Sequence, residues 1–146
     1  MSDCIDEALR LARQASSVGE VPVGAVIVHN QTIIAATHNL VETRHDVSAH
    51  AELEALREAG RILGTRHLTD CDLYVTLEPC PMCAQAISFA RIRRLYFGAY
   101  DPKGGGVEHG PRIFEQSSCH HKPEVIGGLR EGECAALLKS FFAAKR

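Results

Sequence analysis

The chain has 146 residues, of which 45% are hydrophobic and 23% are charged, a balance typical of one soluble globular domain. These values exclude an intrinsically disordered chain, a collagen-like repeat and a small disulfide-dense scaffold. The net charge of −2 does not by itself indicate a nucleic-acid partner, but residues 1–73 sum to −5 and residues 74–146 to +3. A polyanion is therefore expected to meet mainly the second half.

Hydrophobic periodicity predicts helices that alternate with short strands, which indicates an α/β domain layered around a central sheet. No internal repeat or linker interrupts the pattern, so residues 1–146 are expected to form a single domain. In chain order the expected elements are a helix between Ser2 and Gly19, strands at 23–28 and 32–36, a polar loop at 39–46, a helix at 49–59, a strand at 73–77, a helix at 80–90, a strand at 95–97, a glycine-rich loop at 98–110, a strand at 125–126 and a helix at 131–145.

Three local details belong to this prediction. Ser48 is the expected N-cap of the helix at 49–59, and Gly60 is expected to end it. Four apolar residues of the last helix are expected to face the core, namely Leu137, Leu138, Phe141 and Phe142. Four cysteines are interpreted as small buried hydrophobic residues, namely Cys4, Cys71, Cys119 and Cys134.

The start of the chain is acidic, unlike a signal peptide, and no apolar run is long enough to span a bilayer. Six cysteines and eight histidines in such a chain indicate a reducing, cytoplasmic compartment. Closely spaced cysteines there bind metal or perform chemistry instead of forming disulfides. We expect neither membrane association nor a nucleotide cofactor.

Two short motifs predict a metal site. His50-Ala51-Glu52 stands at the start of one expected helix, and Pro79-Cys80-Pro81-Met82-Cys83 at the start of another. Because helix residues three apart project to one side, Cys80 and Cys83 can share an ion, and the positive helix N-terminus favours their thiolates. With His50 they make three N/S ligands, the number typical of catalytic zinc, which lowers the pKa of its bound water to about 7.

Glu52 lies two residues past His50, where it can reach the zinc-bound water without being a ligand, as a proton shuttle must. A fourth protein ligand, for which His45 and Cys71 are candidates, would instead make the site structural. A lone C-x-x-C can also be redox-active. The two motifs in this order, both at helix starts, favour the catalytic interpretation.

These motifs match the signature of the zinc-dependent cytidine deaminase superfamily, and the chain resembles the tRNA-specific adenosine deaminases of that superfamily over nearly its whole length. The stretches that carry the resemblance are residues 20–26, 44–46, 49–52, 73–80, 90–92, 97–99, 101–103 and 133–138.

The resemblance implies a three-layer α/β/α cytidine deaminase-like domain with a central five-stranded mixed sheet and one Zn²⁺ per subunit. It also implies hydrolytic deamination of adenosine to inosine at the wobble position (34) of tRNA anticodons, chiefly that of an arginine tRNA. In the reaction that the resemblance implies, a zinc-activated hydroxide would attack C6 of the purine, while Glu52 would deliver a proton to N1 and then assist the departure of ammonia. The anticodon stem-loop presents this base unpaired.

The resemblance further implies substrate contacts and a homodimer, with the tRNA touching both subunits. Met82, Ile87 and Phe89 are the candidate interface, although core packing explains them equally well. The residues that match family contacts are Glu20, Val23, Asn39 and the Ala51 backbone in the pocket, Asp101 and Lys103 in a loop beside the target, and Phe142, Lys145 and Arg146 at the end of the chain. Taken alone, these are ordinary turn, strand, core and helix-end residues.

The chain departs from the family pattern in two places. Tyr100 stands where an arginine often precedes Asp101, and Val107-Glu108-His109-Gly110 replaces a stretch of small residues. Five basic residues can add phosphate contacts or be surface charges, namely Arg91, Arg93, Arg94, Arg112 and Lys122.

Two other functions stay open. A deaminase of a free base or nucleoside, of guanine or cytosine type, would share every zinc residue, and Asp101-Pro102-Lys103 with the basic last helix favours tRNA over it. A non-catalytic, zinc-stabilised RNA-binding module would not need Glu52, so replacing this residue discriminates the module from the enzyme.

Overall fold

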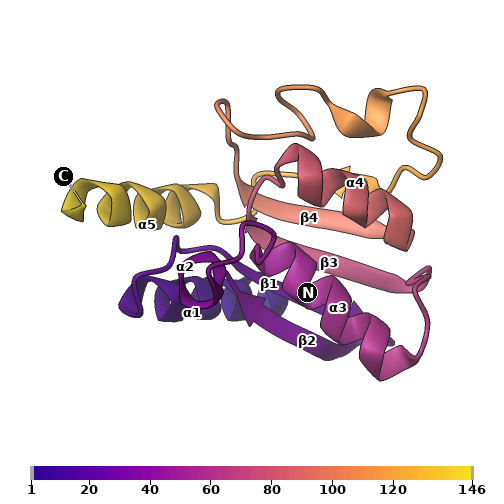
Figure 1. Ribbon diagram of the computed structural model, residues 1–146, viewed down its shortest axis with the longest axis horizontal. Helices are drawn as coiled ribbons and strands as arrows, with labels where there is room; N and C mark the ends of the chain where they lie inside the picture. Colours follow the sequence, from indigo (N-terminus) through magenta and orange to yellow (C-terminus); the bar gives the residue numbers. More distant parts are fainter. Residues whose placement is uncertain (1, 146) are drawn as a thin grey trace.

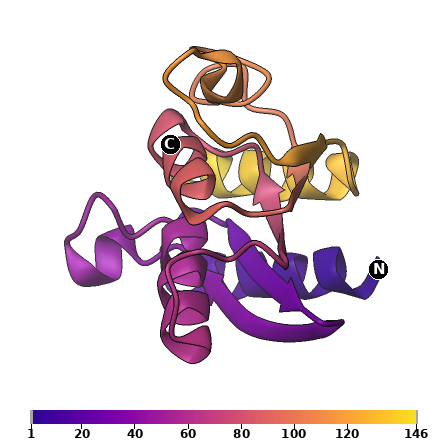
Figure 2. The same ribbon diagram turned by 90° about the vertical axis from the view of Figure 1, so that its right-hand side faces the viewer.

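The computed structural model describes residues 2–145 and contains a five-stranded sheet with helices on both faces (Figures 1 and 2). The strand order is β2-β1-β3-β4-β5. Strand β1 is antiparallel to β2 and β3, whereas β3, β4 and β5 are parallel, so the expected mixed sheet is confirmed. The strands are β1 (Gly24–His29), β2 (Thr32–His38), β3 (Cys71–Leu77), β4 (Arg94–Ala99) and β5 (Glu124–Ile126).

The helices form the two outer layers of the expected three-layer fold. Helices α3 and α4 cover one face of the sheet, and α1 and α5 lie against the other (Figure 2). None of the helices among residues 2–145 is both long enough and apolar enough to span a bilayer. The helices are α1 (Ser2–Ser17), α2 (Val41–Arg44), α3 (Ala51–Leu63), α4 (Pro81–Ala90) and α5 (Glu131–Ala144), with a 3₁₀ turn η1 (Ile113–Glu115).

Alternation along β1 explains why residues 25–28 are all apolar. Ala25 and Ile27 face α3 and α4, whereas Val26 and Val28 face α1. Both faces are buried, which is typical of a central strand between two helical layers. Gly24 begins the strand where α1 crosses it closely, since a Cβ there would lie 2.0 Å from the carbonyl oxygen of Ala8.

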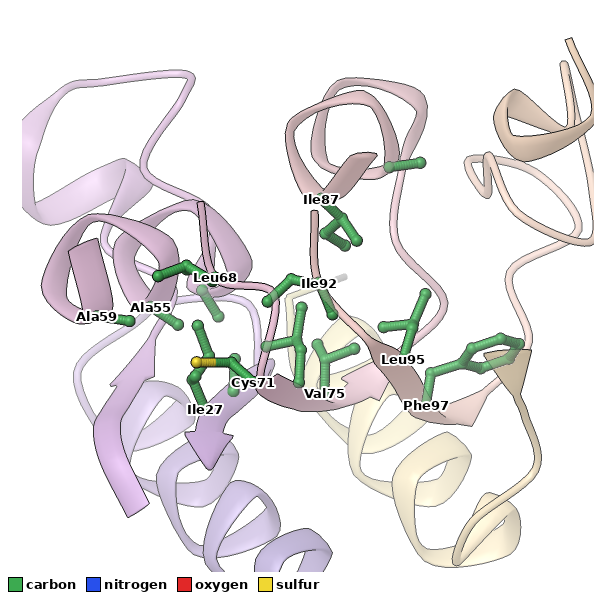
Figure 3. Close-up of a cluster of buried hydrophobic side chains, with 14 of the residues drawn as sticks. Ile27, Ala55, Ala59, Leu68, Cys71, Val75, Ile87, Ile92, Leu95 and Phe97 are labelled. Carbon is green, nitrogen blue, oxygen red and sulfur yellow. The ribbon is translucent and has the colours of Figure 1, made fainter. Parts of the chain in front are cut away.

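Small residues let α3 lie close to the sheet. Ala55 and Ala59, one turn apart, are fully buried, and Figure 3 shows them on one side of a continuous core that includes Ile87 of α4 and Val75 of β3. Burial of each large apolar side chain in such a core contributes roughly 1.5–3 kcal/mol. This packing fixes the N-terminal ends of α3 and α4 relative to the end of β3.

The predictions for the region around residues 39–64 were partly wrong. The expected loop at 39–46 contains the short helix α2. Ser48 does not cap α3, because its hydroxyl donates to Asp46 Oδ1 at 2.7 Å, and His50 is the N-cap. The helix also continues through Gly60 to Leu63, since an interior glycine costs only about 1 kcal/mol, and it ends at Gly64 in the left-handed conformation.

The last helix faces the core with fewer residues than expected. Cys134 is buried, Leu138 packs beside it and Phe142 is 49% exposed, because the C-terminal end of α5 projects past the sheet (Figure 1). Of the other three isolated cysteines, Cys4 and Cys71 are buried as expected and Cys119 is half-buried.

Candidate active site

Three potential metal ligands converge beyond the end of β3. His50 is the N-cap of α3, Cys80 is the N-cap of α4 and Cys83 lies in the first turn of α4. The Nδ1 atom of His50 lies 3.6 Å from Cys80 Sγ and 3.5 Å from Cys83 Sγ. Zinc bonds of about 2.0 Å to nitrogen and about 2.3 Å to sulfur, at a tetrahedral angle, place these atoms about 3.5 Å apart. The three residues therefore fit one zinc ion.

Neither candidate for a fourth ligand joins them. Cys71 begins β3, at the opposite end of the strand, and is buried in the core. His45 is exposed at the end of α2. Among residues 2–145, the metal-binding group is His50 with Cys80 and Cys83. Three protein ligands are typical of catalytic zinc sites, whereas structural sites use four.

The two thiols differ in acidity. A hydrogen bond from the Cys83 thiol lowers the pKa of Cys80 to about 4, and the same hydrogen bond, with burial, raises the pKa of Cys83. Cys80 also stands where the amides of a helix N-terminus stabilise negative charge. The lowered pKa favours the thiolate form of Cys80, which is the form that binds metal.

Glu52 lies in the first turn of α3 and is 4% exposed. Burial raises the pKa of its carboxyl to about 7, because a low-dielectric environment disfavours the charged form. A carboxyl with this pKa can both accept and donate a proton near neutral pH, as general acid–base catalysis requires. It lines the same cavity as His50 and Cys80.

The cavity has a volume of about 330 Å³, near the lower end of the range for small-ligand sites. Its walls come from the segment before β1, the segment around α2, the starts of α3 and α4, and the loop after β4. The lining residues are Glu20, Val21, Val23, Asn39, Val41, Glu42, His50, Glu52, Leu77, Glu78, Cys80, Asp101 and Gly104.

The structure brings the expected pocket residues together. Glu20, Val23 and Asn39 line the cavity. Ala51 is fully buried and does not line it; its backbone N–H donates to Asn39 Oδ1 at 2.8 Å. The Glu20 carboxylate accepts hydrogen bonds from the backbone and hydroxyl of Thr43, so it also holds α2 in place.

Two of the expected RNA-facing residues, Asp101 and Phe142, line a second, apolar groove of about 590 Å³ beside the cavity. Asp101 borders both hollows, and Phe142 lines the groove. Lys103 is exposed on the same loop as Asp101. Lys145 is exposed one turn beyond Phe142, and Arg146 lies outside the described residues.

Several supplementary basic residues lie away from this face. Arg93 donates two hydrogen bonds to Asp72 at the start of β3, and Arg94 pairs with Glu124. Both arginines stand at the opposite end of the parallel strands from the metal site. Arg112 pairs with Glu115. The remaining two, Arg91 and Lys122, are exposed.

Glu78 is a site residue that lies outside the two predicted metal-site motifs. Its carboxylate is 1% exposed and lines the cavity. Burial alone would raise the pKa of Glu78. Hydrogen bonds from Asp101, His109, Glu108 and Val107 outweigh this effect, so the pKa of Glu78 lies below its ordinary value. An acidic residue at the end of a buried strand, next to Pro79-Cys80, is the signal that could have revealed it.

Comparison with known proteins agrees with this fold and site. The family model described as the cytidine and deoxycytidylate deaminase zinc-binding region matches residues 1–99, so the protein is a zinc-dependent deaminase. A tRNA-specific adenosine deaminase from Agrobacterium fabrum is 55% identical over 139 residues, covering 95% of this chain and 91% of the relative. The chain therefore belongs to the tRNA-specific adenosine deaminase family.

Solved structures give the same result. A structure from a study of A-to-I editing by tRNA:A34 deaminases at the wobble position of transfer RNA has 53% identity and a TM-score of 0.93, covering 94% of this chain and all of that one. A guanine deaminase from Bacillus subtilis has 42% identity and a TM-score of 0.65, covering 67% of this chain and 63% of that one. The likeness to the editing enzyme thus extends over more of the fold.

Proposed function

We propose that the protein deaminates adenosine to inosine at wobble position 34 of tRNA anticodons, chiefly that of an arginine tRNA. The observation that carries this proposal is the His50, Cys80 and Cys83 group beside the buried carboxyl of Glu52 in a cavity of about 330 Å³. Homology to tRNA-specific adenosine deaminases over 95% of the chain supports the choice of substrate.

The chemistry replaces the C6 amino group of adenine with oxygen, consuming water and releasing ammonia. A zinc ion held by His50, Cys80 and Cys83 would supply a Lewis acid that activates a water molecule. Glu52 accepts a proton from the water and delivers it to N1 of the base, then carries a proton to the departing amino nitrogen. With its pKa at about 7, this carboxyl can serve in both directions.

Asn39 positions the nucleoside in this proposal. Its Oδ1 is engaged by the Ala51 N–H, which leaves Nδ2 as the group that donates to the substrate. Glu20 and Val23 form the adjoining wall. The target base must leave any stack to enter, and an anticodon loop presents it unpaired.

Asp101 and Lys103 are proposed to contact the RNA backbone beside the target, and Phe142 with Lys145 and Arg146 to hold the rest of the anticodon stem-loop. The apolar groove between Asp101 and Phe142 adjoins the catalytic cavity, and Lys139 adds a positive charge to its wall. An exposed aromatic ring beside cations is suited to unpaired bases and phosphates.

We also propose that the enzyme is a cytoplasmic homodimer, in which residues 1–146 of each subunit form one domain. A groove of about 860 Å³ runs between α3 and α4, with Leu53, Leu56 and the 71% exposed Phe89 in its walls. Of the expected interface residues, Ile87 is fully buried in the core and cannot serve, whereas Met82 is 39% exposed. All six cysteines are free, which suits a reducing compartment.

A stem-loop assay tests the function. An RNA hairpin with the anticodon loop of an arginine tRNA and adenosine at position 34 is expected to gain inosine, read as A-to-G by sequencing, while the same hairpin with guanosine there stays unchanged. Free guanine is the second substrate to test, because of the likeness to a guanine deaminase. Turnover of guanine with no editing of the hairpin would overturn the tRNA proposal.

A further inference from the structure

A buried carboxylate underlies the loop that follows β4. Glu78 Oε1 accepts the backbone N–H of Asp101 at 3.0 Å and lies 2.8 Å from His109 Nδ1. Glu78 Oε2 accepts the N–H groups of Val107, Glu108 and His109 at 3.2, 2.8 and 3.1 Å. One side chain therefore gathers both ends of the segment 101–109. A buried carboxylate needs such partners, because each lone pair removed from water must be satisfied.

The same loop packs directly against residues 79–81, the turn that carries Cys80. The Gly106 N–H donates to the Pro79 carbonyl at 2.8 Å. A Cβ at Gly106 would lie 2.5 Å from Pro81 N, and a Cβ at Gly105 would lie 2.5 Å from Glu78 Oε2. The loop thus contacts the turn that carries Cys80 with no space for side chains between them. Any shift of the loop changes where Asp101 and Lys103 stand relative to the site.

The two places where this chain departs from the family pattern meet at this point. The Tyr100 ring contacts the His109 ring edge-on, with centroids 6.2 Å apart, and packs against Phe97 at 5.1 Å. His109 is held by Tyr100 on one side and Glu78 on the other. The two departures therefore act together, and His109 contributes a side-chain hydrogen bond to the loop that a small residue would lack.

We infer that His109, through Glu78, is a positioning residue that holds the loop at residues 101–109 in place for substrate binding. It contacts neither the metal ligands nor Glu52 among the interactions described above, so it acts on binding and not on the chemical step. The kinetic consequence rests on the proposed function, whereas the ordering of the loop does not.

The test compares His109→Ala with His109→Asn, whose amide can donate to Glu78 in place of Nδ1. His29→Ala is the matched control, because His29 is half-buried as well but ends β1 at the far end of the sheet. His109→Ala removes one hydrogen bond to a charged group. We therefore expect amide hydrogen exchange in residues 101–109 to accelerate about tenfold and KM for the hairpin to rise about tenfold. The kcat is expected to stay within about twofold of the wild-type value. Zinc content is expected to stay at one per chain in all variants.

Restoration of both values by His109→Asn, with His29→Ala unchanged, supports the inference. Unchanged loop exchange in His109→Ala, or a fall in kcat at constant KM, overturns it. If His109→Ala loses its zinc, the result for His109→Asn decides. An asparagine variant whose amide exchange in residues 101–109 stays fast would also overturn the inference. Faster loop exchange in a protein whose wild type edits no RNA would support the positioning role and overturn the proposed function.

Discussion

Asn39 allows a sharp test because one side chain carries two separable roles. Its Oδ1 accepts the N–H of Ala51 at 2.8 Å, and the two residues are 8% and 0% exposed. This N–H belongs to the first turn of α3, where backbone donors have no partner inside the helix. The N-cap residue His50 makes no capping hydrogen bond, so Asn39 satisfies the donor from outside the helix.

Asn39→Ala leaves the Ala51 N–H buried without an acceptor, which costs about 1–3 kcal/mol. A loss of about 2 kcal/mol in the free energy of unfolding is expected to lower the melting temperature of the zinc-loaded protein by about 6 °C. Asn39→Asp keeps an oxygen in the same place, and a negative charge beside a helix N-terminus is favourable. This variant is expected to melt within about 2 °C of the wild type.

Activity separates the roles, because both variants lack Nδ2. We expect kcat/KM for the hairpin to fall about tenfold even in Asn39→Asp, the effect of losing one substrate hydrogen bond. Calorimetry and steady-state kinetics on the same preparations give the two readouts. An alanine variant that melts like the wild type would refute the capping role, and wild-type kcat/KM in the aspartate variant would refute the substrate role.

Three further outcomes are expected. Glu52→Gln should retain zinc but lose deamination by at least about 100-fold. Because the pKa of Glu52 is raised to about 7, folding disfavours its ionised carboxyl. In urea unfolding of the zinc-free proteins, the free energy of unfolding of Glu52→Gln should exceed that of the wild type by about 3 kcal/mol at pH 8 and by less than about 1 kcal/mol at pH 5; a difference independent of pH would contradict this. Cys83→Ser should lower both zinc content, measured by metal analysis, and activity, while Cys119→Ser keeps both. Phe89→Glu should sediment as a monomer and Val47→Glu, at an 83% exposed position, as a dimer; a dimeric Phe89→Glu would exclude the α3/α4 groove as the interface.

Local patterns in the sequence were sufficient to predict the group formed by His50, Cys80 and Cys83 and most of the sheet. Cys80 and Cys83 could be predicted because helical geometry fixes their relation, and His50 with Glu52 because residue types and spacing restrict their chemistry. The apolar run at residues 23–28 likewise predicted a strand, and β1 follows it closely.

The contacts that complete the site depend on pairings between distant segments. Asn39 meets Ala51 12 residues away, and Glu78 meets His109 31 residues away. Both contacts exist only once the strands are in register and the helices lie on the sheet, which no local pattern encodes. The error at Phe142 has a similar origin, because helical periodicity identifies an apolar face but not where the sheet beneath it ends.

The placement of His50 and Cys80 at the N-caps of two different helices has a thermodynamic consequence. An ion bound there cross-links positions 30 residues apart, and a link that closes a loop of this length removes about 3–4 kcal/mol of conformational entropy from the unfolded chain, on the scale used for disulfides. The six cysteines form no disulfide. The metal would therefore cross-link a domain whose cysteines form no covalent cross-link, and the affinity of the metal would be coupled to the folding of α3 and α4.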